Sequence, residues 1–295
     1  MTTDGAGRPR TLIAESGPER SFRVSRASTQ ASVAGTSMPA GPWLNGPDGT
    51  PVAGALGVLV DNALGSALML MSGRPRDRWP VSAEISLDMC RPWPADATVL
   101  RAEARNVHSD TSGGVSSGAV RDEQGRLIAL CRQHSRWAAS MPTAAPAGQH
   151  HGERKVTAAA SAAGPADLIA ALIAPIKASG GAASLELTVT GELVNPLGNL
   201  HGGITLCACD LLAQAALRTL GGPSGTTSVH VAYTRPCPLG ATVLFESSVA
   251  HCGRGLGVVQ VTLANQDRKP CAIATVVTGA LAQPATPAVP PPDAT

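Results

Sequence analysis

The sequence is poor in the residue types that mark several classes of site. Aromatic side chains make up only 2% of the 295 residues, and the net charge of +2 comes with no basic run. Both features argue against a nucleic-acid partner, which needs basic patches and stacking rings. No apolar run reaches the roughly 18 residues that span a bilayer, and the first residues lack the apolar segment of a secretory signal. We therefore expect a cytoplasmic protein without a membrane span.

Patterns that bind metals and nucleotides are missing as well. The seven cysteines form no C-x-x-C pair, and an odd number without an export signal is typical of reduced thiols. Cys207 and Cys209 would point to different faces of a helix, and no further ligand has the spacing of a zinc site. The Gly-rich phosphate motifs are also absent. We expect no metal and no cofactor.

What the sequence does contain is an apolar core divided by low-complexity segments. Apolar residues make up 43% of the chain, which is enough for a core built from Val, Leu, Ile and Ala. Two segments rich in Ala, Pro and Gly have no periodicity and are predicted to be disordered. The predicted organisation is a disordered tail over 1–20, a first domain over 21–140, a linker over 141–164, a second domain over 165–281 and a Pro-rich disordered tail over 282–295.

The two predicted domains resemble each other in sequence. Arg91–Leu100 reads RPWPADATVL, and Arg235–Leu244 reads RPCPLGATVL. Upstream, GALGVLVDNALGSAL matches GGITLCACDLLAQAAL when Asp61 is set on Asp210. A single repeat of this length indicates a tandem domain duplication rather than a solenoid.

Each half shows the same order of elements. An extended segment is followed by one long apolar helix and then by a run of alternating strands, such as TTSVHVAYTRP and ATVLFESSVAHC in the second half. This order predicts an α+β fold in which an antiparallel sheet wraps around a central helix. Because a helix that is apolar on all sides must be covered all round, we expect the two halves to pack as a pseudo-dimer.

The strongest motif lies in the second half. Asn195, His201, Gly202, Gly203 and Asp210 are followed by TTSVHVAYTRPCPLGATV. Together they resemble the hot-dog-fold acyl-CoA thioesterases, and most of all the phenylacetate-degradation (PaaI-like) type of the 4-hydroxybenzoyl-CoA thioesterase superfamily. The resemblance covers residues 183–280 well and 46–137 more weakly.

The resemblance implies a fold, an activity and partners. Members of this group are usually dimers or tetramers of single hot-dog units, so this chain resembles a double hot dog. The implied function is hydrolysis of an acyl-CoA to a free acid and CoA, and a homodimer of fused chains is a further expectation. The alternative is a catalytically inactive protein that binds acyl-CoA or an acyl chain as a sensor. A hydratase acting on enoyl-CoA would need an Asp/His dyad that the sequence does not show.

The motif residues suit the chemistry of thioester hydrolysis. The start of a helix leaves backbone N–H groups unpaired, and glycine lets a carbonyl oxygen approach them. Gly202 is therefore a candidate oxyanion donor, with Gly203 beside it as a substrate-binding residue and Asn195 as a second donor. We expect His201 to hold the loop in position rather than act as a base. The simpler interpretation is that the glycines only allow close packing.

The acid of the motif can be a general base or a nucleophile, because burial in an apolar helix would raise its pKa. The simpler interpretation is a satisfied core acid. On a single helix, Gly202 and Asp210 would be roughly 12 Å apart at about 1.5 Å per residue. One thioester carbonyl cannot contact both, so the acid is expected to come from the other half, where Asp61 occupies the matching position. The resemblance adds Ser82 as the supporting hydroxyl of Asp61.

The mirror-image site is predicted to be damaged. The alignment places Val52 opposite His201 and Ala53 opposite Gly202. The His-Gly turn that would bind the thioester carbonyl is therefore not repeated in the first half. Gly46 stands opposite Asn195, with Asn45 one step away. We therefore expect one working site, and a weak second site at most around Asp210 and Thr226.

Overall fold

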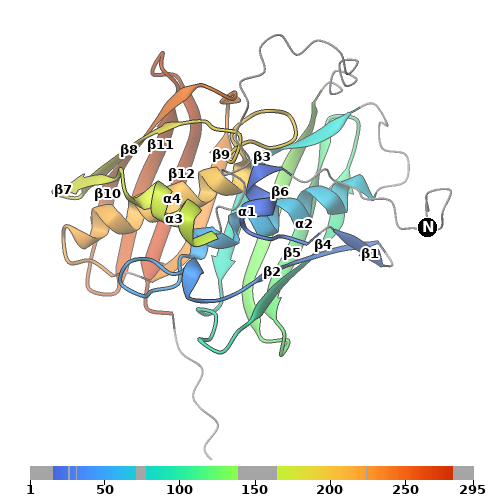
Figure 1. Ribbon diagram of the computed structural model, residues 1–295, viewed down its shortest axis with the longest axis horizontal. Helices are drawn as coiled ribbons and strands as arrows, with labels where there is room; N and C mark the ends of the chain where they lie inside the picture. Colours follow the sequence, from blue (N-terminus) through green and yellow to red (C-terminus); the bar gives the residue numbers. More distant parts are fainter. Residues whose placement is uncertain are drawn as a thin grey trace, which may run out of the picture.

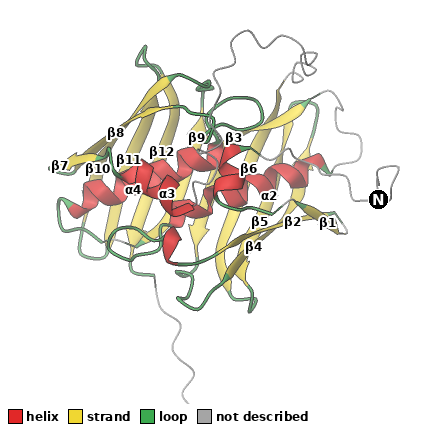
Figure 2. Ribbon diagram, in the orientation of Figure 1, coloured by secondary structure: helices red, strands yellow, loops and turns green. Residues whose placement is uncertain are grey.

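The computed structural model describes residues 16–25, 27–30, 32–70, 78–138, 165–223 and 225–281. The predicted linker over 141–164 and the predicted tail over 282–295 lie outside the described residues. Within the described part, one twelve-stranded sheet carries a band of helices across one face (Figure 1, Figure 2). No helix in that part has the length and apolar character needed to cross a bilayer.

The sheet is antiparallel throughout and continuous from one half of the chain to the other. Its strands are β1 (Ser28–Gln30), β2 (Val33–Pro39), β3 (Trp79–Met89), β4 (Val99–Ser109), β5 (Gly113–Asp122), β6 (Leu127–Ala138), β7 (Lys177–Ser179), β8 (Ala182–Thr188), β9 (Thr226–Tyr233), β10 (Thr242–Cys252), β11 (Leu256–Ala264) and β12 (Pro270–Gly279). The halves meet where β3 pairs with β9, at residues 84–88 and 228–232.

The strand order is mirrored about this central seam. Read outward, the first half runs β3, β6, β5, β4, β2, β1, and the second runs β9, β12, β11, β10, β8, β7. Equivalent loops also share their hydrogen bonds. The Val52 N–H donates to the Leu44 carbonyl at 3.0 Å, and the His201 N–H donates to the Leu193 carbonyl at 2.9 Å. The spatial equivalence of the two loops therefore follows the alignment made on the sequence.

Two helices form the centre of the core. They are α2 (Gly57–Met69) and α4 (Gly202–Arg218), and short helices α1 (Gly17–Ser21), α3 (Pro165–Ile173), η1 (Pro42–Leu44) and η2 (Ala53–Leu56) surround them. Every residue of α2 except Asp61 is buried. In α4, only the terminal residues Gly202 and Arg218 are not buried. Such apolar helices are stable here because the sheet and the other helix cover them.

The N-termini of α2 and α4 touch backbone to backbone. A Cβ atom on Gly57 would overlap with the carbonyl oxygen of Gly203, and a Cβ on Gly203 would overlap with the backbone of Gly57. Neither glycine has a left-handed backbone, so the close approach itself requires the absence of a side chain. This contact places the start of each helix beside the acid of the other.

The N-terminal segment corrects one prediction. The disordered tail was predicted over 1–20, but residues 17–21 form α1, and the side chain of Glu19 is buried. The helix begins at a capping box, in which Ser16 and Glu19 satisfy each other's free backbone groups, with Pro18 in the first turn. Residues 1–15 lie outside the described part.

Candidate active site

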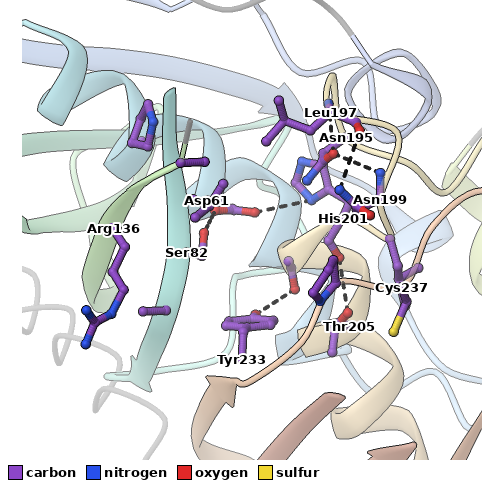
Figure 3. Close-up of a pocket in the computed structure, with 18 of the residues that line it drawn as sticks. Asp61, Ser82, Arg136, Asn195, Leu197, Asn199, His201, Thr205, Tyr233 and Cys237 are labelled. Atoms are coloured by element: carbon purple, nitrogen blue, oxygen red, sulfur yellow. Dashed lines mark hydrogen bonds and ion pairs between the residues drawn. The ribbon is translucent and has the colours of Figure 1, made fainter. Parts of the chain in front are cut away.

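A cavity of about 520 Å³ opens between the two halves of the chain. Asp61, Ser82 and Gln133 line it from the first half, while the second half contributes residues of the α4 N-terminus and of β9 (Figure 3). Five predicted residues, Asp61, Ser82, Asn195, His201 and Gly202, thus lie around one space.

Asp61 projects from α2 toward the start of α4. Its Oδ1 accepts a hydrogen bond from the Ser82 hydroxyl at 2.7 Å, and its Oδ2 accepts one from the Gly203 N–H at 3.1 Å. The side chain is 13% exposed, and it lines the cavity. A carboxylate that is held by two donors and still faces the cavity can accept a proton from a bound water molecule.

The hydroxyl that holds Asp61 is itself held in place. Gln133 on β6 donates from Nε2 to the Ser82 oxygen at 2.8 Å and to the Ser135 hydroxyl at 3.0 Å. Since Ser82 uses its own proton on Asp61 and accepts from Gln133, the chain of donors runs in one direction toward the carboxylate. This network fixes the rotamer of Asp61 from the sheet side.

His201 caps the first turn of α4. Its Nδ1 lies 3.0 Å from the Gly203 nitrogen and 3.3 Å from Asp61 Oδ2, and its Nε2 lies 3.2 Å from Glu19 Oε1. Because an ionised Glu19 can only accept, Nε2 carries the proton, and in the neutral ring Nδ1 accepts the Gly203 N–H. The ring is buried at 4% exposure, which fits a positioning role.

The charges around this ring change its titration. Burial alone would lower the pKa of His201, but the hydrogen bond to Glu19 and the charges of Asp61 and Glu19 raise it above its ordinary value. Burial alone would likewise raise the pKa of Glu19, yet bonding to His201 and Ser16 lowers it to about 2. Glu19 is therefore ionised at neutral pH, and the imidazole lies between two carboxylates.

The two glycines of the motif have different surroundings. Gly202 lines the cavity, and a Cβ atom there would lie 2.8 Å from Asp61 Oδ2. Among the described residues, the Gly202 N–H has no hydrogen-bond acceptor. It is therefore an unpaired donor at the N-terminus of α4. Tyr233 steadies this turn by donating its hydroxyl to the Gly202 carbonyl at 2.8 Å.

Gly203, predicted to bind substrate beside Gly202, lies outside the cavity wall. It is buried, and its N–H is already used by Asp61 and His201. Its close contact with Gly57 explains why the motif needs a second glycine. The packing interpretation therefore applies to Gly203, and the free N–H belongs to Gly202.

Asn195 lines the cavity, but half of its amide is occupied by its own loop. Its Oδ1 accepts hydrogen bonds from the N–H groups of Leu197 at 3.0 Å and of Asn199 at 3.1 Å. Among the described residues, the Asn195 Nδ2 group has no hydrogen-bond acceptor, so it remains able to donate to a ligand. The loop bonds orient this donor.

Asp210, the equivalent of Asp61, is sealed from the solvent. Its exposure is 0%, and it accepts from the Gly54 N–H at 2.7 Å, from the Thr226 hydroxyl at 2.5 Å and from Gln214 at 3.2 Å. Burial raises the pKa of Asp210, and these bonds offset that effect only in part. Thr226 thus holds Asp210 as Ser82 holds Asp61, but Asp210 lines neither this cavity nor the one that Thr226 lines.

Three contributors to the site were not identified from the sequence: Glu19, Gln133 and Tyr233. The Ser16-x-x-Glu19 pattern is a capping box and could have indicated a helix there, although not its contact with His201. Tyr233 is the only tyrosine of the chain and follows an alternating strand, which was a usable signal. No cluster of metal-ligating side chains occurs among the described residues.

Comparison with known families matches both halves of the chain. The acyl-CoA thioesterase C-terminal domain model matches residues 18–136, and the acyl-CoA thioesterase N-terminal domain model matches residues 192–279. The order of the two matches is therefore the reverse of the order in the names. Together they cover more than two thirds of the chain.

Curated relatives match part of the chain. Acyl-coenzyme A thioesterase 13 of Homo sapiens and that of Pongo abelii are each 29% identical over 93 residues, or 31% of this chain and 66% of the relative. The match thus spans just under two thirds of the length of these relatives.

Solved structures share the fold over most of the chain. A structure named oleoyl thioesterase from Lactobacillus plantarum is 13% identical, has a TM-score of 0.58, and covers 86% of this chain and 99% of its own. An acyl-ACP thioesterase from Bacteroides thetaiotaomicron is 12% identical with a TM-score of 0.54, and covers 83% and 97%. These likenesses show the hot-dog fold of thioesterases. The two domain models thus relate both halves of the chain to acyl-CoA thioesterases.

Proposed function

We propose that the protein hydrolyses an acyl-CoA to a free acid and CoA at one site built across its two halves. The observation that carries this proposal is the contact of Asp61, from α2 of the first half, with the start of α4 in the second half, 3.1 Å from the Gly203 nitrogen. On this view the fused units act as a double hot dog of the PaaI-like type. The mirrored strand order supports that arrangement.

The chemistry follows from where charge develops. The thioester carbonyl oxygen would accept the free N–H of Gly202 at the positive end of α4, with Asn195 as a second donor. Asp61 takes a proton from water, and the hydroxyl adds to the carbonyl carbon. When the tetrahedral intermediate collapses, the C–S bond breaks and the CoA sulfur receives the proton held by Asp61. Attack by Asp61 itself would pass through an anhydride and gives the same products.

The supporting residues keep this geometry. His201 and Tyr233 hold the first turn of α4, while Ser82 holds the acid. None of them needs to exchange a proton with the substrate. We also propose a cytoplasmic location and a homodimer of fused chains, on the grounds given by the sequence and the family resemblance.

Paired variants of the two equivalent acids test the proposal. Asp61→Asn should lower kcat/KM for acyl-CoA hydrolysis by roughly 10²–10⁴-fold, since the general base is lost. The matched control, Asp210→Asn, removes the same charge from the sealed position and should leave kcat/KM within a few fold. Thiol release from a panel of acyl-CoAs is the measurement. A silent Asp61→Asn variant with an inactive Asp210→Asn variant would reverse the assignment, and binding without thiol release would favour a sensor.

A further inference from the structure

A second, larger cavity of about 1180 Å³ lies at the mirror position of the first. Its wall includes Thr226, Ala53, Arg91 and Met89. In the alignment of the two halves, these stand where the first cavity has Ser82, Gly202, Arg235 and Tyr233. The second cavity is therefore the twin of the candidate active site.

The twin lacks the parts needed for hydrolysis. Val52 replaces the histidine, and Ala53 replaces the glycine that carries the free N–H. Asp210 does not belong to the cavity wall, and Gln214 donates to it from the position that Gly65 occupies beside the first cavity. A ligand held in this cavity would therefore lie apart from the carboxylate of Asp210.

The charges of the twin favour an anion more strongly than those of the first cavity. Three arginines, Arg91, Arg126 and Arg254, line it against the single carboxylate of Asp48. The first cavity has two arginines against the two carboxylates of Glu19 and Asp61.

Two of these arginines are open to a ligand. Arg126 already pairs with Asp122 at 2.5 Å and with Asp96 at 3.1 Å. Arg91 and Arg254 form no ion pair among the described residues. Guanidinium groups bind phosphate oxygens in a bidentate manner. The wall also includes several prolines and Trp93, whose side chain is largely buried at 6% exposure.

We propose that this twin cavity binds the phosphorylated nucleotide end of a second coenzyme A, free or acylated, and does not hydrolyse it. Arg91 and Arg254 hold the phosphates, and Trp93 lies in the same cavity wall. The choice of coenzyme A over other nucleotides rests on the proposed function, because it is taken from the ligand of the first cavity. The chain thereby carries a catalytic site and a non-catalytic site for the same molecule.

The chain provides one fluorescent reporter for each cavity. Trp79 lines the first cavity and Trp93 lines the twin. In a Trp79→Phe chain, coenzyme A should still quench the tryptophan fluorescence. In a Trp93→Phe chain, the part of the quenching that reports binding in the twin cavity should be lost. Calorimetric titration of the unmodified full chain with coenzyme A should give two sites per chain.

Variants of Arg91 and Arg254 test whether these two side chains bind coenzyme A in the twin cavity. Arg91→Ala with Arg254→Ala should weaken the Trp93 response by roughly tenfold for each arginine and leave one calorimetric site. Arg91→Lys with Arg254→Lys keeps the charge and should restore part of the affinity. The matched control, Arg235→Ala, changes the first cavity and should leave the Trp93 response intact. Melting temperatures check that each variant is folded.

Each outcome separates this inference from the proposed function. One coenzyme A per chain with hydrolysis overturns the second site alone. Two coenzyme A molecules per chain without hydrolysis overturn the proposed function and leave the second site standing. Inorganic pyrophosphate or ADP binding to the Trp93 site as tightly as coenzyme A also overturns the inference, since the cavity would then select only charge.

Discussion

At the scale of the residue, two acids in equivalent positions have opposite surroundings. Asp61 is the one residue of α2 that is not buried, and it faces a cavity. Asp210 is fully buried and has three donors around it. The residue is the same in both halves, so its access to a cavity depends on the neighbours: Gly65 leaves space beside the first acid, and Gln214 fills that space beside the second.

The sequence could predict some of these residues and not others. The motif and the repeat placed Asp61, Asn195, His201 and Gly202 in one pattern, the resemblance added Ser82, and all five line one cavity. Glu19 was not, because it contacts a histidine 182 residues away and belongs to a segment without apolar periodicity. The burial of Gly203 against Gly57 was also beyond the pattern, since it depends on how two helices touch.

Replacing Glu19 should disturb the α4 turn without removing a reacting group. Glu19→Gln keeps a hydrogen-bond acceptor but removes the charge that raises the pKa of His201. We expect kcat to fall roughly tenfold, as when one charge-assisted hydrogen bond is lost, with a smaller change in KM. The control is Glu123→Gln in an exposed loop that lines neither cavity. Equal activity of the two variants would show that Glu19 has no effect on the site.

The same carboxylate makes stability dependent on pH. Its pKa is lowered in the folded chain from an ordinary 4.5 to about 2. A lowered carboxyl pKa contributes stability above the ordinary value, and that contribution disappears as the pH falls through the folded value. The difference in melting temperature between the native chain and Glu19→Gln should therefore be largest above pH ~5 and narrow toward pH ~2. A difference that widens on acidification would contradict the assignment.

At the scale of the element, the strands were the most predictable part. The alternating segments TTSVHVAY and TVLFESSVAHC correspond to β9 and β10, because period-two alternation is a local property of the chain. The apolar helices were equally visible. Helix α1 was missed, since five residues with a proline and a glycine carry almost no periodic signal, and its stability comes from a capping box and contacts with distant residues.

The contact between the two helix starts is the element-scale feature most sensitive to a single methyl group. Gly57→Ala would place a Cβ against the Gly203 carbonyl, so the helices must separate. We expect a loss of roughly 2 kcal/mol in the free energy of unfolding, typical of overpacking. Activity should also fall, because the Gly203 N–H moves relative to Asp61. Chemical denaturation and hydrolysis assays measure the two effects.

A glycine of the second half provides the control for this experiment. Gly191→Ala meets no atom within 4 Å, and its backbone is not left-handed. Its free energy of unfolding should change by less than about 0.5 kcal/mol. If both variants behave alike, the helix contact is not tight.

At the scale of the whole molecule, the halves share one sheet and one apolar core. Strands β3 and β9 pair at the seam, and buried side chains of both halves belong to a single cluster. The repeat in the sequence indicated two similar units, but it could not show that their sheets join edge to edge. That arrangement depends on which strands are left unpaired at the edge of each unit, which is a property of the folded halves.

This continuity leads us to expect one cooperative unfolding transition. All four tryptophans lie in the first half, at positions 43, 79, 93 and 137, whereas far-ultraviolet circular dichroism reports on the strands of both. The two probes should give the same denaturation midpoint, because neither half can lose the seam and keep its core covered. Midpoints that differ would show that the halves unfold independently.

The start of α4 and the acid Asp61, which both line the first cavity, belong to one chain, and this has an evolutionary consequence. In an assembly of two identical subunits, any substitution is copied into both sites, so a change that improves one function at one site is imposed on the other. Here the gene specifies the histidine side and the acid side of each cavity separately, and a single mutation alters one cavity only. The position of Ala53 could therefore diverge from that of Gly202 while the residues of the first cavity stayed unchanged.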